Sequence, residues 1–539
     1  MKMEKTIYNI KRLGVTKVML ATVFFTALTL GGCDKITDLQ PNNSFSEETA
    51  FSSAARAELA MTGVYDAAQS GFYAGGAVRG YPFGAANTEQ GDMRGEDMMN
   101  VATFFALTYE GLYDVTTANN QYQWETLFSL VNRANVVIEG VQAAGAANTI
   151  AAAKAIEYEA EAKFLRAMAY QELLVHFARP YDHTAGATHP GVPYRTVAVN
   201  TPAKVDEAKS QGRNTVKECY DKMIEDLSFA EANLPPTRTG ALKVSRATKG
   251  AAIALKVRAY LNMGNWAQVI AESDKIVQGA TAFTSSIGGY ALTASPNGPF
   301  ATPAANLANT ESMFSIENAS TDNPGTNGAI GQMYSKSPGR GLVAISPIIW
   351  NAPFWKANDL RRTQLATNNG RAYFTTKYTD YVTFTDANPI IRYSEVLLSR
   401  AEAFARITPL DPRALALLNA VRNRAVTSVT DQFTIASFIS GNSLIQSILD
   451  ERRIEFLAEG RRWADIHRLA NDPVFNSGGV PAKVAYTGTT FASWNATTPY
   501  AGSRSITAIP YSDFRFVWPI PQTETSSNEV LKEQQNPGY

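Results

Sequence analysis

Apolar residues recur at the i, i+3, i+4 spacing of amphipathic helices over most of this chain. The spacing predicts helices over residues 46–70, 121–142, 154–178, 213–233, 245–263, 266–279, 390–407, 411–426 and 442–471. These segments arrive in pairs along the chain. The predicted fold class is therefore mainly α, built from helical pairs.

The clearest pair covers residues 251–277, AAIALKVRAYLNMGNWAQVIAESDKIV. Tyr260 and the turn Gly264-Asn265-Trp266 match a tetratricopeptide unit, in which the glycine permits the sharp turn and the aromatic ring seals the pair. The match is partial, because Val269 and Ser273 replace the usual small and aromatic residues. We expect a tetratricopeptide-like scaffold in which stacked pairs share a core.

A second pair is divided at Pro409-Leu410-Asp411-Pro412. Asp411 is suited to capping the following helix, and Pro412 to its first position.

Three long stretches lack helical periodicity. Residues 71–115, 280–389 and 473–538 mix Gly, Pro, Asn and Thr with aromatic side chains. Connections of this length in a compact protein are commonly functional. We expect the chemistry of the protein to lie on these insertions.

The N-terminus has the pattern of a lipoprotein signal. Basic residues precede an apolar run over 18–30, and Gly31-Gly32 stand directly before Cys33. The run is shorter than the ~20 residues that cross a bilayer, which favours a cleaved signal over a permanent transmembrane helix. The pattern predicts cleavage before Cys33 and lipidation of that cysteine.

Composition excludes some classes of partner. Lys+Arg and Asp+Glu balance at 49 each, so no global field attracts nucleic acid. With Cys33 lipidated, Cys219 is the only other thiol, and no intramolecular disulfide forms.

Signatures of catalysis are missing. The chain has no G-x-S-x-G elbow, phosphate-binding loop or H-E-x-x-H pair. His183, His189 and Asp182 fit no standard metal-ligand spacing, and we expect no metal and no cofactor. Glu451, Glu455 and Glu459 repeat every four residues near Arg452, Arg453, Arg461 and Arg462. We interpret this motif as an ion-pair network that locks the last helices, with an acid/base site as the alternative.

Several segments together resemble the SusD/RagB family of outer-membrane nutrient-binding lipoproteins. The matching pieces are the cleavage box at Cys33, Trp124 with residues 132–135 (NRAN), and residues 161–174, 251–277, 390–403, 419–425, 449–469, 517–524 and 534–539. The resemblance covers essentially the whole chain, and the pieces occur in the family's order.

The resemblance implies how the chain is organised and what it does. It implies a signal peptide over 1–32, an N-terminal SusD-like region over 33–280 and a C-terminal region over 281–539, with a ligand-face insertion at 281–389 and a helical block at 390–472. It also implies a non-enzymatic binder of oligosaccharides, or in some members of peptides. Such a binder is anchored on the outer membrane as the lid of a SusC-like TonB-dependent transporter.

Pyranose rings bind flat on aromatic side chains, with polar groups at the rim. The insertions over 71–115 and 280–360 offer suitable groups, Tyr73 among them, and in the resembling family these two regions bring the ligand contacts together. Trp350 and Trp355 are the preferred candidates, because large rings on such segments have little core to enter. The further candidates are Tyr334, Asn351, Tyr81, Asp92, Arg94 and Tyr290. For any one ring, packing beneath its own loop is the alternative.

Two other functions are alternatives to an oligosaccharide binder. A surface glycosidase would draw its carboxylates from Asp92, Glu96 and Asp97, but nothing in their spacing separates an acid from a nucleophile. A tetratricopeptide adaptor for peptide tails would lack such long insertions.

Overall fold

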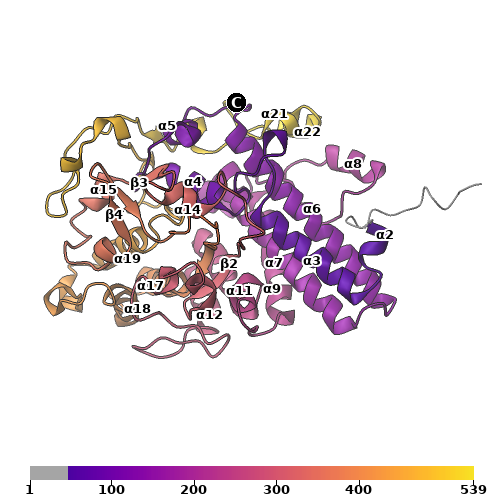
Figure 1. Cartoon of the computed structure of the whole chain (residues 1–539), viewed down its shortest axis with the longest axis horizontal. Coiled ribbons are helices and arrows are strands. Elements are labelled where there is room, and N and C mark those ends of the chain that lie inside the picture. Colours follow the sequence, from indigo (N-terminus) through magenta and orange to yellow (C-terminus); the bar gives the residue numbers. More distant parts are fainter. Residues whose placement is uncertain (1–46) are drawn as a thin grey trace, which may run out of the picture.

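The computed structural model describes residues 47–539, which form a mainly helical molecule (Figure 1). Its long helices are α3 (Ala54–Gln69), α6 (Ala118–Ala146), α7 (Ala152–Phe177), α9 (Val216–Asn233), α11 (Lys249–Asn262), α12 (Trp266–Asp274), α17 (Tyr393–Ile407), α18 (Pro412–Arg422) and α19 (Gly441–Glu455). The predicted mainly α fold is confirmed. The signal and Cys33 lie outside the described residues.

Shorter helices lie between the long ones and near the two ends of the described chain. They are α2 (Glu47–Ala50), α4 (Ala85–Met93), α5 (Ala106–Glu110), α8 (Pro202–Lys209), α10 (Leu242–Ser245), α13 (Ala305–Ala308), α14 (Ile330–Tyr334), α15 (Pro347–Trp350), α16 (Arg361–Gln364), α20 (Arg462–Arg468), α21 (Gln522–Thr525) and α22 (Glu529–Glu533). No helix within 47–539 has the length and apolar character that a membrane crossing requires.

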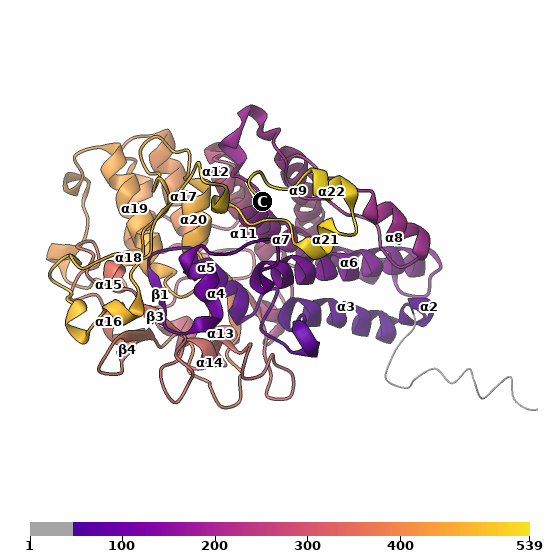
Figure 2. The ribbon, with the colours of Figure 1, turned by 90° about the horizontal axis from the view of Figure 1, so that it is seen from above.

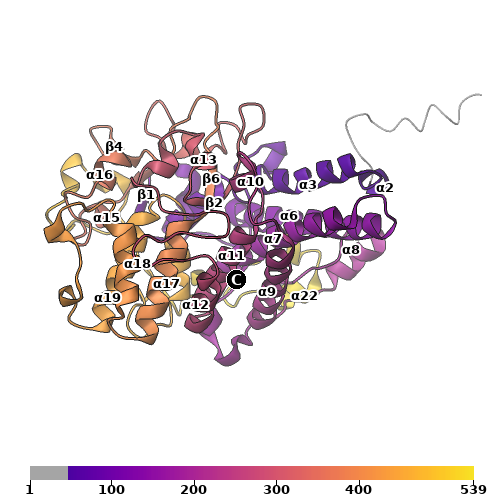
Figure 3. The same ribbon diagram turned by 90° about the horizontal axis from the view of Figure 1, so that it is seen from below.

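The long helices stack in sequence order. α6 packs on α7, α7 on α9, α9 on α11, α11 on α12, α12 on α17, and α17 on both α18 and α19. Figure 3 shows this series running from the N-terminal helices to α17–α19 at the opposite end. Each helix buries its apolar stripe against its neighbours, as stacked pairs do.

Local signals set the helix ends. The Asp411 carboxylate accepts a hydrogen bond from the Arg413 backbone N–H at 2.8 Å, and Pro412 occupies the first turn of α18. Gly264 adopts φ +66° between α11 and α12, a left-handed conformation that glycine allows without strain. Both predicted turns are confirmed.

The predicted helix over 442–471 is interrupted. α19 ends at Glu455 and α20 begins at Arg462, with Ala458 and Gly460 at positive φ between them. A Cβ on Gly460 would lie 2.9 Å from the Thr88 backbone, so the break lets the chain approach α4 closely. α4 itself lies inside the stretch 71–115, where the pattern predicts no helix.

A small sheet joins the first two insertions. Its strands are antiparallel in the order β1-β3-β5-β4, and β1 pairs Met98 with Ile345 of β3. The strands of the molecule are β1 (Met98–Asn100), β2 (Ser312–Ile316), β3 (Val343–Ile345), β4 (Ala366–Asn368), β5 (Tyr373–Thr375), β6 (Asn388–Arg392), β7 (Gly479–Val480) and β8 (Ile509–Pro510). β1 therefore ties the stretch 71–115 to 280–389.

Two large apolar clusters fill the molecule. The helical core lies among α3, α6, α7, α9, α11, α17 and α18. The sheet core lies beneath β1, β3 and β5 and takes side chains from α4, α5, α14 and α15. Figure 2 shows β1 and β3 beside α4 and α5 at this junction.

Candidate functional site

The two preferred tryptophans are buried in the sheet core. Trp350 is 5% exposed and Trp355 2%. The Trp350 ring stacks on Tyr373 at 3.8 Å, and the Arg362 guanidinium lies 4.7 Å from its centroid. The expectation that these rings have little core to enter is wrong, because the pairing of the two insertions creates that core.

Tyr334 and Asp92 meet across the same core. The buried Tyr334 hydroxyl donates to Asp92 Oδ2 at 2.6 Å, and the Gly460 N–H donates to Asp92 Oδ1 at 3.0 Å. Burial, only partly offset by these hydrogen bonds, raises the pKa of Asp92 to about 7. This pair joins α4 to α14 and to the break after α19.

Two further candidates, Arg94 and Tyr290, also lie inside. Arg94 donates to the Phe516 carbonyl, and its guanidinium lies 3.5 Å from the centroid of the Trp463 ring. The Tyr290 hydroxyl lies 2.9 Å from the Thr248 hydroxyl in the helical core.

Asn351 is buried and holds a neighbouring loop. Its side chain donates to the Ser493 carbonyl at 3.0 Å and accepts from the Asn495 N–H at 2.8 Å. Asn351 and the other predicted residues are thus packed within the protein, and their contact with a ligand stays a prediction.

A different group of aromatic side chains reaches the surface. We define the aromatic patch as Phe72, Tyr73, Arg79, Phe104 and Tyr122. Tyr73 and Tyr122 have ring centroids 4.4 Å apart, and Phe72 meets Tyr122 edge-on at 6.2 Å. Phe72 is 40% exposed, and the other members are half-buried.

Arg79 rests on two rings of the patch without a charged partner. Its guanidinium carbon lies 5.2 Å from the Tyr73 centroid and 4.8 Å from the Phe104 centroid. Within residues 47–539, it makes no ion pair, and its Nε–H is buried without an acceptor. The Arg79 Nε–H is therefore a hydrogen-bond donor without an acceptor.

The patch has a rigid support. Tyr81, one of the predicted candidates, lies behind Tyr73 with its ring nearly parallel at 6.4 Å. Asn119 Oδ1 lies 3.3 Å from the Tyr81 hydroxyl, and Gln90 donates to that hydroxyl at 3.3 Å. Tyr81 therefore positions the patch from below, at a point where the start of α4 approaches Gly328 of the second insertion.

The hydroxyls of Tyr73 and Tyr122 have no hydrogen-bond partner among the described residues. The patch thus combines ring faces with unpaired hydroxyl and guanidinium groups at its edge. This arrangement suits a ligand that has both C–H faces and hydroxyls.

The carboxylates weighed for a glycosidase are engaged elsewhere. Glu96 accepts from Arg453 at 2.9 Å and from Arg462 at 2.7 Å, and Asp97 pairs with Arg453. The cavity beside Asp92 and Asp97 has a volume of about 10 Å³, which is too small for a sugar ring.

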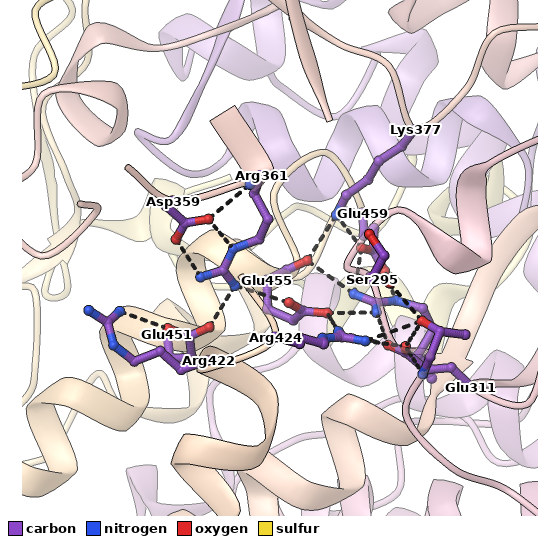
Figure 4. Close-up of polar contacts among 12 residues, drawn as sticks. Ser295, Glu311, Asp359, Arg361, Lys377, Arg422, Arg424, Glu451, Glu455 and Glu459 are labelled. Atoms are coloured by element: carbon purple, nitrogen blue, oxygen red, sulfur yellow. Dashed lines mark hydrogen bonds and ion pairs between the residues drawn. The ribbon is translucent and has the colours of Figure 1, made fainter. Parts of the chain in front are cut away.

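The acidic repeat in α19 and just beyond its end forms a buried network (Figure 4). Glu451, Glu455 and Glu459 are each at most 6% exposed. Their cationic partners are Arg361, Arg392, Arg422, Arg424 and Lys377. The predicted network is confirmed, but its cations come from distant segments.

The sequence neighbours of the repeat point away from it. Arg452 pairs with Asp465 at 2.9 Å, while Arg453 and Arg462 reach Glu96. Successive residues of a helix face different directions, so adjacent charges bind different segments.

Sequence reasoning identified Tyr73 as a suitable ring but missed Arg79, Phe104 and Tyr122. Tyr122 lies in α6, outside the insertions in which the ligand contacts were expected. The available signal was the local density of aromatic residues, glycines and one arginine over residues 72–81.

Two family models match this chain. One, described as "SusD family", matches residues 356–539, and one described as "Starch-binding associating with outer membrane" matches 39–261. A curated relative, "SusD-like protein P2" of Formosa agariphila, is 25% identical over 401 residues, which cover 66% of this chain and 73% of the relative.

Solved structures share the fold. A SusD superfamily protein from Bacteroides fragilis has a TM-score of 0.72 at 26% identity, covering 89% of this chain and 99% of its own. A structure described as a "Laminarin binding SusD-like protein" has a TM-score of 0.65 at 19% identity, covering 90% of this chain and 100% of its own.

Proposed function

Since this chain belongs to the SusD/RagB family, we propose that it is a carbohydrate-binding protein of the outer membrane that captures oligosaccharides at the aromatic patch. The family description supports association with the outer membrane, and the solved relative named for laminarin binding supports a glycan as ligand.

The unpaired guanidinium of Arg79 on Tyr73 and Phe104 carries this proposal. A pyranose ring on the faces of the patch places its hydroxyls near an arginine and two tyrosine hydroxyls that have no protein partners. Binding replaces the hydrogen bonds of these groups to water with hydrogen bonds to the ligand.

The proposal also includes the lipid anchor and the transporter partner that the resemblance to the SusD/RagB family implies. In this proposal, Cys33 bears the lipid anchor, and the protein delivers its ligand to a SusC-like TonB-dependent transporter. It performs no catalysis itself. A peptide is the alternative ligand of the same patch, because an arginine also binds carboxylates.

A glycan array on residues 34–539, followed by calorimetry, tests the ligand. Arg79→Gln should weaken binding of the selected glycan by about 1–3 kcal/mol and leave thermal stability nearly unchanged. Arg371→Gln is the matched control, because the Arg371 guanidinium also lies over an aromatic ring, 4.3 Å from the centroid of Tyr486, at an exposed position outside the patch. Equal affinity in both variants would remove the patch from the proposal, and a peptide library that alone gives binders would replace the glycan.

The anchor and the partner have separate tests. Cys33→Ala should abolish labelling by radioactive fatty acid and leave a folded protein. Gently solubilised membranes should yield the unmodified protein together with a larger outer-membrane protein. Recovery of the protein alone, while other outer-membrane complexes remain intact, would contradict the transporter partnership.

A further inference from the structure

A large cavity lies apart from the aromatic patch, between the loop after α7 and the C-terminal segment. Its volume is about 670 Å³, which is sufficient for a small organic molecule. Its polar lining includes Arg179, His183, Arg213, Tyr511 and Glu533. Val517, Pro190 and Pro537 contribute apolar wall.

The arginines of this cavity have no carboxylate counter-charge. Arg179 donates to the carbonyls of Tyr511 and Asp513. Arg213 donates to neutral acceptors only, which are the carbonyls of Phe177, Pro190, Gly191 and Gln534 and the side chain of Asn536. Both arginines are half-buried and neither makes an ion pair with a described residue, although removing a cation from water without a counter-ion is unfavourable.

The nearby carboxylates do not neutralise this charge. Asp513 is paired with Arg515 at 2.7 Å. Glu533 is exposed at the rim and makes no ion pair in the described part of the chain. The lining therefore has two guanidinium groups against one rim carboxylate.

The two histidines of the cavity, His183 and His189, differ in the hydrogen bonds of their ring nitrogens. His189 Nε2 lies 3.1 Å from the Arg179 carbonyl, so this nitrogen carries the proton, and His189 Nδ1 accepts from the Thr184 hydroxyl at 2.9 Å. With both nitrogens engaged, His189 has none left for a metal, and no group of three or more ligating side chains within 47–539 is placed to hold one.

His183 has one nitrogen available. Its Nδ1 lies 2.7 Å from the Tyr511 hydroxyl, which can donate to it, leaving the proton of neutral His183 on Nε2. Among the described residues, Nε2 has no hydrogen-bond partner and provides a donor at the cavity wall.

We propose that this cavity is a second binding site, which takes a small organic anion with a carboxylate or sulfate group. The anion supplies the negative charge that Arg179 and Arg213 lack. Its uncharged part lies against Pro190, Val517 and the Tyr511 ring. The site shares no residue with the aromatic patch, so it does not depend on the function proposed there.

Calorimetry with matched probes tests this proposal on residues 34–539 at constant ionic strength. Methyl glucuronide should bind about tenfold more tightly than methyl glucoside, because the two differ only in the carboxylate. Glucose 6-sulfate serves as the sulfate arm, and either anionic probe supports the site. Equal affinity for the charged and uncharged sugars would overturn it, as would binding of inorganic sulfate without either anionic sugar.

Variants locate the binding. Glu533→Gln removes the rim carboxylate without breaking a described contact and should tighten anion binding about two- to fivefold at low salt. Arg179→Met should abolish it, and His183→Ala should weaken it. If Arg179→Met fails to fold, the Glu533→Gln result decides, and unchanged affinity there would overturn the assignment. Arg79→Gln should bind glucuronide normally, which separates this site from the aromatic patch.

Discussion

The α19 network and the aromatic patch use arginine in opposite ways. In the network, Arg361, Arg392 and Arg424 are buried, and every one of them is bound by carboxylates. In the patch, Arg79 lies on two aromatic rings and has no carboxylate partner among residues 47–539. The first arrangement fixes distant segments to each other, whereas the second leaves hydrogen-bonding capacity for another molecule.

The same contrast divides the aromatic residues. Trp350 and Trp355 are enclosed beneath the sheet, where burial makes them part of the folding energy. Tyr73 and Tyr122 are half-buried and keep free hydroxyls. Ring size is therefore a poor guide to exposure, because the largest rings of the insertions are the ones that the sheet core encloses.

The largest expected effect comes from breaking the network. Glu455→Gln removes a charge that binds three arginines and leaves the buried network with one carboxylate fewer than it needs, so it should lower the free energy of unfolding by about 3–5 kcal/mol. Chemical denaturation measures this loss. Glu529→Gln is the control, because the exposed pair of Glu529 with Lys532 contributes about 0–1 kcal/mol. Similar stability of the two variants would show that the network is dispensable.

A comparable loss is expected when a buried ring is truncated. Trp350→Ala should lower the free energy of unfolding by about 3–5 kcal/mol, because it opens a cavity in the sheet core. Tyr73→Ala, at the surface, should change it by only about 1 kcal/mol. A stable Trp350→Ala protein that has lost glycan affinity would instead assign Trp350 to the ligand.

The buried Asp92 should make stability depend on pH. Its pKa of about 7 in the fold lies above the usual 3.8, so the folded state holds a proton that the unfolded state releases. This stabilisation is complete below pH 3.8 and is lost as the pH rises through 7. Across that window, the wild type should lose up to about 4 kcal/mol more than Asp92→Asn.

Denaturation of both proteins at a series of pH values measures the difference. Asp221→Asn, at an exposed residue paired with Lys217, should follow the wild type. Parallel curves for wild type and Asp92→Asn would show that the fold does not raise the pKa of Asp92.

The smallest expected effect separates ring faces from hydroxyls in the patch. Tyr73→Phe and Tyr122→Phe retain the rings and remove one hydroxyl each, so each should weaken glycan binding by about 0.5–1.5 kcal/mol. Calorimetry measures the affinity, and thermal denaturation should show no change. Unaltered affinity in both would leave ring stacking and Arg79 as the only contacts of the patch.

Much of the scaffold was predictable from the sequence. Helical periodicity is local, and so are the cap at Asp411 and the turn at Gly264, which the structure confirms. The acidic repeat of α19 also indicated a network, since three carboxylates on one helical face require cations.

The partners of that network were decided only by the tertiary structure. Arg361, Arg392 and Arg424 lie far from Glu455 in the sequence, and nothing local selects them over Arg452 or Arg453. The side chain of a helical residue points in one direction, and the fold determines which segment it meets there.

The sequence by itself determined the mainly helical scaffold, the turns at Gly264 and Asp411 and the family, because these depend on short-range patterns. Only the tertiary structure decided which aromatic rings are exposed to solvent. Trp350 and Tyr73 both lie in stretches without helical periodicity, but pairing of β1 with β3 covers the first and leaves the second at the surface. Burial depends on contacts between distant segments, which a local pattern does not encode.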